Sequence, residues 1–380
     1  MVVKQIYELM NGVTTELLGK SNVVLEDLSN VVDVGRELFD NASVDAYVKS
    51  LVNRIGRVIF VNRPYSGNVP SVLMDSWEFG SVTQKIDAEM PDATENESWN
   101  LTDKTEYNPN IFYQPKVTSK FFNNKVTFEI PMSFTERQVK QSFNSANELN
   151  AFISMIYNAV DKSFTVKIDG LIMRTINNMI AETLAVETAN IRAVNLLKDY
   201  NTITGLTLTA DKALTDKEFI RYASKTMTVY ADRMGKLSTL FNVGGKARFT
   251  SKDYLKGVML SDFKASIDAY ALADIRHNEY ITFPACDIVP YWQGSGTGYD
   301  FTSVSSINVK TSGGKTVNQS GILAILFDKE ALGVTNLDKR VTTSYNAKGE
   351  FFNNFYKMDC GSFNDLNENF VVLFIKDTSV

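Results

Sequence analysis

The stretch that decides the fold of this chain is residues 146–184, ANELNAFISMIYNAVDKSFTVKIDGLIMRTINNMIAETL. Its apolar side chains recur every three or four residues, a spacing that predicts an α-helix. These side chains are Leu149, Phe152, Ile153, Ile156, Val160, Phe164, Ile168, Leu171, Ile172, Ile176, Met179 and Ile180. Ser145 or Asn147 can cap the first turn, and Glu148 lies three residues after Ser145, as in a capping box. Gly170 costs about 1 kcal/mol in a helix interior, so a bend is expected there.

A helix over this run would span roughly 55 Å at about 1.5 Å per residue, far longer than an ordinary globular helix. The chain lacks coiled-coil heptads, so such a helix needs a long partner surface. Periodicity alone leaves one alternative open, a core helix of some large α+β domain.

The composition is typical of a folded protein. At 380 residues, with 44% hydrophobic and 11% aromatic residues, the chain can bury a large core and form two or three sub-domains. No stretch approaches 18 consecutive apolar residues, and the first residues lack a secretory signal, so neither a membrane span nor secretion is expected. The two cysteines, Cys286 and Cys360, fit a reducing compartment and are interpreted as small core residues.

Residues that carry catalysis or bind metals are scarce. The single histidine, His277, excludes a His-rich metal site and is expected at a helix end or on the surface. Gly314-Lys315-Thr316 resembles the end of a phosphate-binding loop, but Val309 stands where that motif requires glycine. We therefore predict no catalytic residue, no cofactor and no metal ligand, and we do not expect an enzyme.

The acidic charge is concentrated in one polar segment, residues 87–106. This segment has seven acidic residues against one lysine, a net charge of −6, whereas the whole chain carries −5, which leaves +1 for the remainder. Strand-like alternation before it (Trp77–Ser81) and after it (Val126–Met132) predicts a two-stranded arm with an acidic tip. An isolated ribbon is marginal in water, so the arm must lie on another surface. A disordered surface loop is the alternative.

The remainder predicts an α+β organisation. Residues 1–45 have enough apolar positions for short helices but not for a core of their own. Helices are expected over Asp45–Arg54, ending near Gly56, and over Asp216–Met234 and Ser261–Arg276; strands are expected over Cys286–Tyr291, Gly321–Phe327 and Phe370–Ile375. The last two runs are continuously apolar, which indicates central strands of a covered sheet. Residues 293–320 are expected to form an exposed loop or hairpin, and residues 337–358 an extended segment with a turn at 346–349.

The order of these parts resembles that of a known family. Four stretches carry the resemblance: YVKSLVNRIG at 47–56, FISMIYNAV at 152–160, AILFDKE at 324–330 and NAKGEFFNNFY at 346–356. In this order and at these intervals they resemble the major capsid proteins of tailed bacteriophages, which have the Hong Kong 97-like capsid fold. Among these, the chain is most similar to the proteins of short-tailed phages of the phi29 type. The resemblance covers about residues 45–378.

The resemblance implies an α+β subunit divided as that fold is divided. The implied parts are an N-terminal arm (1–45), a peripheral domain (46–65 and 119–190) with a long spine helix, an extended loop (66–118), an axial domain (191–336), and a peripheral strand with the C-terminal strand (337–380).

It also implies a structural function. Copies of the chain would assemble through hexamers and pentamers into the icosahedral or prolate head shell that encloses the double-stranded DNA genome of a tailed phage. The implied partners are other copies, a separate scaffolding protein and a portal protein, with no membrane. A pI near 5.2 without a Lys/Arg run argues against sequence-specific DNA binding. The protein would be part of the virion and assemble in the host cytoplasm. An encapsulin-type nanocompartment shell of the same fold is one alternative, and an adhesion or tail protein is another.

The acidic segment predicts a contact between subunits. Its acidic residues are Asp87, Glu89, Asp92, Glu95, Glu97, Asp103 and Glu106. Basic residues gather on either side of the arm: Arg54, Arg57, Arg63, Lys116, Lys120, Lys125, Arg137 and Lys140. We expect the acidic tip of one subunit to lie over such basic residues of its neighbour and to form intersubunit ion pairs.

Overall fold

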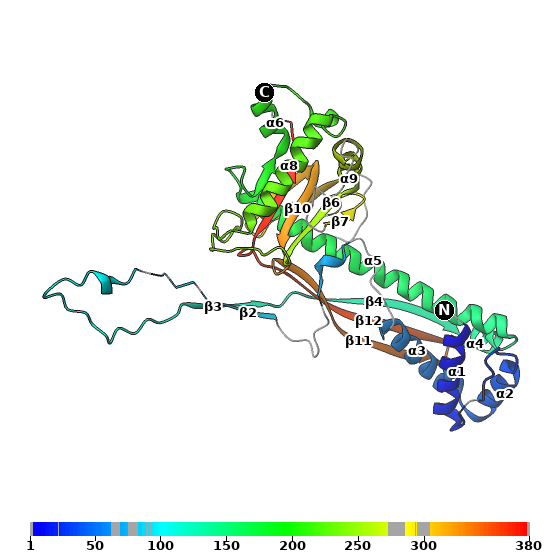
Figure 1. The fold of residues 1–380 in the computed structure, drawn as a ribbon. Coiled ribbons are helices and arrows are strands. Elements are labelled where there is room, and N and C mark those ends of the chain that lie inside the picture. The colour runs from blue at the N-terminus through cyan, green and yellow to red at the C-terminus, as the bar shows by residue number, and fades with distance from the viewer. Residues whose placement is uncertain are drawn as a thin grey trace.

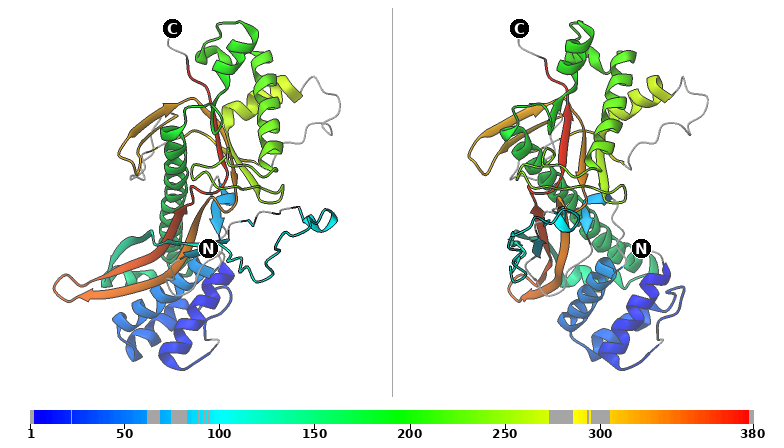
Figure 2. Two further views of the ribbon diagram at one scale, coloured as in Figure 1. Left: turned by 90° about the vertical axis from the view of Figure 1, so that its left-hand side faces the viewer. Right: turned by 60° about the vertical axis from the view of Figure 1, so that its left-hand side comes forward.

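The protein is an elongated body from which one long loop projects (Figure 1). The computed structural model describes residues 3–21, 23–61, 69–74, 83–88, 90, 91, 93, 95–272, 286–292, 294 and 305–377. A long helix runs along the body from a four-stranded sheet to a five-stranded sheet, and a group of N-terminal helices lies at the far end of the four-stranded sheet (Figures 1 and 2).

The predicted long helix is confirmed as α5 (Ala146–Val186). Ser145 is its N-cap, and its side chain accepts a hydrogen bond from the backbone N–H of Glu148 at 3.2 Å. The helix is unbroken at Gly170, and Figure 1 shows α5 as one rod without a sharp kink, so the expected bend is absent. Gly170 is buried, and tertiary packing on this half of the helix offsets its low helix propensity.

The buried surface of α5 widens along its length. In the first half the buried residues form one stripe, Leu149, Ile153, Ile156, Val160, Phe164 and Ile168, whereas between Gly170 and Thr183 they lie on all sides of the helix. The first half packs on the four-stranded sheet, where the rings of Phe152 and Phe134 contact edge to face with 5.4 Å between their centroids. The second half reaches the five-stranded sheet and the hairpin of β8 (Ser306–Lys310) and β9 (Thr316–Ser320). One helix therefore joins the cores of both sheets.

The four-stranded sheet consists of β1 (Leu73–Met74), β11 (Leu332–Asn346), β12 (Phe351–Asn364) and β4 (Lys125–Thr135), in that order. The strands β11, β12 and β4 are antiparallel, and β1 is parallel to β11. Alternate residues of β12 are buried, so one face of this strand packs on the core. The predicted turn is confirmed, because the side chain of Asn346 accepts hydrogen bonds from the backbone N–H groups of Lys348 and Gly349.

The five-stranded sheet has the order β5 (Ala193–Asn195), β13 (Phe370–Phe374), β10 (Ile322–Asp328), β6 (Leu255–Leu260) and β7 (Cys286–Val289). Every residue of β10 and β13 is buried, which confirms the two predicted central strands. The helices of this body are α6 (Leu196–Thr204), α7 (Ala210–Ala213), α8 (Lys217–Met234) and α9 (Ser261–Ile267), which continues as a π-helical turn over Asp268–Leu272. A hairpin of β8 (Ser306–Lys310) and β9 (Thr316–Ser320) confirms part of the expected loop or hairpin.

The N-terminal region forms helices, as expected, and these pack on the rest of the subunit. It forms α1 (Val3–Leu18), α2 (Val31–Asn41) and α3 (Val44–Val61), so the helix expected to end near Gly56 continues to Val61. Ile6, Met10 and Val13 of α1 are fully buried, and α1 contacts α3 and α5. Residues 1–45 therefore bury their apolar side chains against the rest of the subunit, in line with the expectation that they have no core of their own.

The strand pairing of the predicted arm is also different. The strand β2 (Thr83–Ala88) pairs with β3 (Val117–Phe122), whereas β4, which contains the predicted partner run Val126–Met132, pairs with β12. Trp77–Ser81 lies outside the described residues, as does His277. Alternation identified Val126–Met132 as a strand but carried no information about its partner.

Three short helices complete the element order: Pro70–Val72, Glu97–Trp99 and α4 (Glu136–Ser142), which opens with a capping box on Thr135.

We predict that Ile172→Ala lowers the free energy of unfolding by about 2–5 kcal/mol, because Ile172 is fully buried on α5 and its truncation leaves a cavity between packed elements. Val166→Ala is the matched control on the same helix, since Val166 is 43% exposed, and we expect a change within about 0.5 kcal/mol. Denaturant unfolding of the purified subunits measures both. Equal losses would contradict burial as the cause.

Candidate functional site

The extended loop comprises β2, β3 and residues 89–116 between them, and it projects from the body as a thin arm (Figures 1 and 2). Its base is the antiparallel β2–β3 ladder, in which Lys85 lies opposite Lys120 and Asp87 opposite Thr118. Two lysines directly across a ladder repel each other, so this pairing requires nearby carboxylates. The structure supplies them from the far end of the chain.

Both lysines of the ladder bind carboxylates of the turn that follows β12. The ammonium of Lys85 lies 2.6 Å from Glu368 Oε1 and 3.3 Å from Asp365 Oδ2, and it also contacts Glu330 at 3.1 Å. Lys120 pairs with Asp365 Oδ1 at 2.8 Å. Asp365 and Glu368 are nearly buried, with 2% and 8% of their side chains exposed. The base of the loop is therefore fixed to the turn that joins the two sheets.

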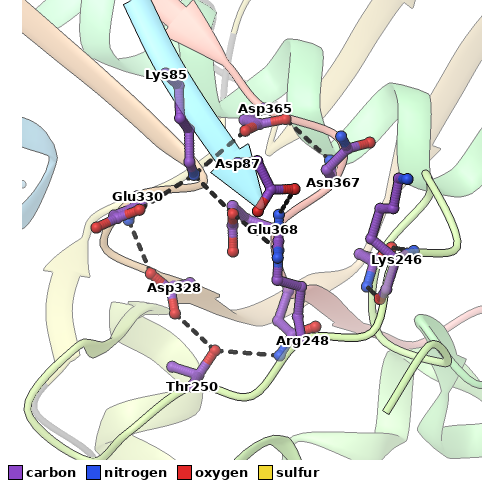
Figure 3. A network of polar contacts seen from close by, with 12 residues as sticks. Lys85, Asp87, Lys246, Arg248, Thr250, Asp328, Glu330, Asp365, Asn367 and Glu368 are labelled. Atoms are coloured by element: carbon purple, nitrogen blue, oxygen red, sulfur yellow. Dashed lines mark hydrogen bonds and ion pairs between the residues drawn. The ribbon is translucent and has the colours of Figure 1, made fainter. Parts of the chain in front are cut away.

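A third cation reaches the same place from the irregular segment 235–254. Arg248 pairs with Asp87 of β2, and its Nε lies 3.2 Å from Glu368. Behind it, the hydroxyl of Thr250 donates to Asp328 Oδ2 at 2.8 Å. Figure 3 shows these side chains converging from the loop, the 235–254 segment and the turn after β12.

We call this cluster the basal network. Its charged members are three cations and five carboxylates: Lys85, Lys120, Arg248, Asp87, Asp328, Glu330, Asp365 and Glu368. Burial raises the pKa of Glu368, against the opposing effect of Lys85 and Arg248. Burial would also raise the pKa of Asp365, but hydrogen bonds from Lys120 and the backbone of Asn367, with the charges of both lysines, hold it below its usual value. Asp365 is thus stabilised as a carboxylate, whereas Glu368 takes up a proton more readily.

The tip of the loop, residues 89–116, is acidic and also strongly apolar. The side chains of Glu95, Asp103 and Glu106 are exposed. Large apolar side chains are exposed beside them: Met90 (61%), Trp99 (93%), Leu101 (65%), Tyr107 (46%), Ile111 (52%), Phe112 (84%) and Tyr113 (81%). Exposed apolar groups gathered in this number mark a binding surface. Sequence reasoning weighed only the charges, although the aromatic residues were equally visible in the same segment.

The structure places the predicted acidic residues in two different environments. Asp87 belongs to the basal network and pairs with Arg248 of its own subunit, which the sequence did not predict. Glu95, Asp103 and Glu106 lie on the exposed tip. Glu89 and Asp92 lie outside the described residues, as does the side chain of Glu97.

Several predicted basic residues have partners within their own subunit. Arg54 pairs with Glu16 at 2.9 Å, Lys120 with Asp365, and Lys140 with Glu136 at 2.8 Å. Three other predicted residues are exposed: Arg137, Lys116 and Lys125. The side chain of Arg57 and the whole of Arg63 lie outside the described part of the chain. The predicted intersubunit ion pairs therefore stay a prediction.

Within the described part of the chain, no group of three or more His, Cys, Asp or Glu side chains is arranged to hold a metal ion. None of the helices in that same part is long and apolar enough to cross a membrane. The described cavities are surface grooves, and two of them flank α5, one at each end of β4.

We predict that Asp365→Asn lowers the free energy of unfolding at pH 7 by about 1–3 kcal/mol, because it removes a nearly buried carboxylate that accepts charged hydrogen bonds. The pKa of Asp365 is lowered in the folded state. The stability that its carboxylate contributes to the folded state is therefore present above the unfolded pKa of about 3.9 and is lost as the pH falls through the folded pKa. The difference between variant and wild type should therefore shrink below about pH 4.

Glu368→Gln is the matched control. The pKa of Glu368 is shifted upward, so its charged form is disfavoured in the folded state and neutralisation at pH 7 should cost less than in Asp365→Asn. Urea unfolding of both variants between pH 3 and 7 gives the comparison. A loss for Asp365→Asn that is independent of pH would contradict the assigned role.

Protein chains in solved structures of two bacteriophages have a similar fold. The capsid of Staphylococcus phage Andhra has a TM-score of 0.54 at 10% sequence identity, covering 83% of this chain and 86% of that chain. The structure of the head fiber and inner core protein gp22 of native bacteriophage P68 has a TM-score of 0.52 at 8% sequence identity, covering 82% of this chain and 86% of that chain. At these identities the likeness shows the fold alone. No curated protein sequence matches this chain.

The expected Hong Kong 97-like capsid fold is confirmed by these structures and by the arrangement of a long helix, two sheets and an extended loop. The sequence model of one family, Phi29-like phage major capsid protein, matches residues 10–374, nearly the whole chain. The chain therefore belongs to the Phi29-like phage major capsid proteins, the structural subunits of the head shell in tailed phages.

Proposed function

We propose that copies of this chain assemble through hexamers and pentamers into a closed icosahedral or prolate head around the double-stranded DNA genome of a tailed phage. Family membership supports the shell. The geometry supports it through one observation: the extended loop carries an exposed aromatic tip away from its own body. Trp99 is 93% exposed and Phe112 84%, so the tip buries them only against another molecule.

The shape of the subunit favours a head-to-tail contact. The loop leaves one side of the elongated body, while α4 and the N-terminal helices lie at the opposite end (Figure 1). A contact between two different surfaces of identical subunits is heterologous, and such contacts generate rings when the rotation closes. Rings of this kind are the capsomers that a closed shell requires.

Assembly of the shell would involve two further proteins and take place in the host. A separate scaffolding protein would guide assembly, and a portal protein would occupy one vertex. The acidic pI of about 5.2 favours an inner surface that tolerates packed DNA and does not bind it in a sequence-specific way. Assembly would take place in the host cytoplasm, and the role is structural, without enzymatic activity. An encapsulin-type compartment that encloses a protein cargo is the second candidate, supported only by the shared fold.

Electron microscopy of the expressed chain, alone and with a candidate scaffolding protein, tests the function. Closed shells or capsomers are expected. Shells from infected cells should contain nuclease-protected double-stranded DNA, whereas an enzyme cargo in place of DNA would favour the encapsulin alternative. A chain that remains monomeric at high concentration, with and without the scaffolding protein, would contradict the shell function.

We predict that neutralising Asp92, Glu95 and Glu97 together slows assembly several-fold at low salt and leaves subunit folding unchanged. Each exposed ion pair contributes only about 0–1 kcal/mol, so the effect requires several charges and disappears as salt screens them. The matched control neutralises three exposed acidic residues elsewhere, Asp211, Asp232 and Asp253. Light scattering at 50 mM and 500 mM salt follows assembly. Equal rates for the two triple variants at low salt would rule out a role for the acidic tip.

A further inference from the structure

A groove of about 470 Å³ lies at the connection between β3 and β4, where the extended loop joins the body (Figure 1). Three parts of the chain line it: residues 121–124 of that connection, Thr175 and Asn178 of α5, and residues 362–364 at the end of β12. We call it the amide groove. Ligand sites in proteins have volumes of roughly 300–1,000 Å³, so the amide groove is large enough for a short stretch of polypeptide.

The lining of the amide groove is polar but uncharged. It consists of four asparagines, three phenylalanines, one threonine and one serine, and none of these nine described side chains is ionisable. Charged residues make up 22% of the chain, and other grooves contain them: Glu148 lines the groove between β4, α4 and α5, and Arg137 and Glu350 line a third. A charged ligand would lose hydration in the amide groove without gaining a counter-charge, so the lining favours an uncharged ligand.

Several polar groups of the lining are available to a ligand. Within the described residues, the side-chain amides of Asn123, Asn124 and Asn178 have no hydrogen-bond partner, and neither has the hydroxyl of Ser362. An asparagine side chain has two N–H donors and one carbonyl acceptor, so it can both donate to and accept from another amide. The ligand that matches these groups is one with amides of its own.

The walls of the amide groove are held together by contacts between its three parts. The side-chain amide of Asn364 donates to the backbone carbonyl of Thr175 at 3.1 Å, which joins the end of β12 to α5. The rings of Phe122 and Phe363 pack with 5.1 Å between their centroids, which joins the β3–β4 connection to β12. Because these parts already contact one another, little free energy is lost in ordering them when a ligand binds.

We propose that the amide groove binds an uncharged, extended segment of a partner protein. The asparagine side chains recognise the amide groups of the segment, and the phenylalanine rings cover an apolar side chain. Amide groups recur at roughly 3.4 Å intervals along an extended chain, so one segment can meet several of these asparagines at once. A sugar offers hydroxyl groups in place of amides and is the alternative that the experiment includes.

A segment bound in the amide groove would also bear on the direction of the extended loop. Asn364, which lines the groove, directly precedes Asp365, which pairs with Lys120 in the basal network. The ligand would therefore contact the β3–β4 connection and α5 beside the point where the loop is fixed to the body. Binding should slow hydrogen exchange of the backbone amides at 121–124.

Two short peptides that differ in one group test the recognition. Acetyl-Phe-Asn-amide is uncharged, whereas acetyl-Phe-Asp-amide has a carboxylate in place of the side-chain amide. We expect the uncharged peptide to bind free subunits with a Kd of roughly 0.1–1 mM, as is usual for a ligand of this size. The charged peptide should bind at least fivefold more weakly at pH 7. Isothermal titration calorimetry below the assembly concentration measures both, with methyl glucoside as the third probe.

Substitutions locate the site. Asn178→Leu removes one amide at nearly constant side-chain volume and should weaken binding of acetyl-Phe-Asn-amide at least fivefold. Asn158→Leu is the matched control, because Asn158 is an exposed asparagine of α5 about 30 Å along the helix, and it should change the Kd less than twofold. Phe121→Ala should also weaken binding severalfold, and since Phe121 is 63% exposed, the subunit should fold normally.

Each outcome supports or overturns the assignment. Equal affinity for the two peptides, no binding of either at 20 mM, or equal losses for Asn178→Leu and Asn158→Leu would overturn it. Tighter binding of methyl glucoside than of acetyl-Phe-Asn-amide, lost in Asn178→Leu, would replace the peptide with a sugar. All these measurements use free subunits, so their failure leaves the proposed shell function standing, and the absence of shells would not alter them.

Discussion

The rest of the structure depends on the burial of α5. This helix is about 60 Å long at 1.5 Å per residue, and its two halves belong to different cores. The first half offers one apolar stripe to the four-stranded sheet, whereas the second half is buried on all sides. Because one rigid helix enters both cores, the two sheets cannot turn relative to each other without breaking its packing. A rigid subunit of this kind can repeat the same contacts around a shell.

After α5, the chain returns from the five-stranded to the four-stranded sheet between β10 and β11, and it crosses a third time at the turn 365–369 between β12 and β13. The basal network is built on this turn, so the extended loop takes its direction from the junction that α5 also spans. Nearly buried carboxylates are costly unless cations reach them, and Lys85, Lys120 and Arg248 do so from two other segments. Each of the two nearly buried carboxylates contacts two cations, so removing one cation weakens this compensation and ties the direction of the loop to the integrity of the junction.

What the sequence could predict depended on how local each signal is. The spacing within residues 146–184 predicted α5 and its cap because helical periodicity and capping act over a few residues. The buried strands β10 and β13 could be predicted equally well, because each is a continuous apolar run. The basal network was not predictable, since Lys85 and Glu368 are 283 positions apart and Arg248 and Asp87 are 161 apart. The pairing of β2 with β3 was missed for the same reason.

The loop tip combines two properties that limit each other. Exposed aromatic side chains such as Trp99 and Phe112 favour any apolar partner, including the tip of another free subunit. The tip, residues 89–116, has six acidic residues against two lysines, and this net charge of −4 opposes that pairing because two tips would bring like charges together. The acidic residues therefore select against contact between two free tips, whereas the exposed aromatic residues favour burial against a surface of a different kind.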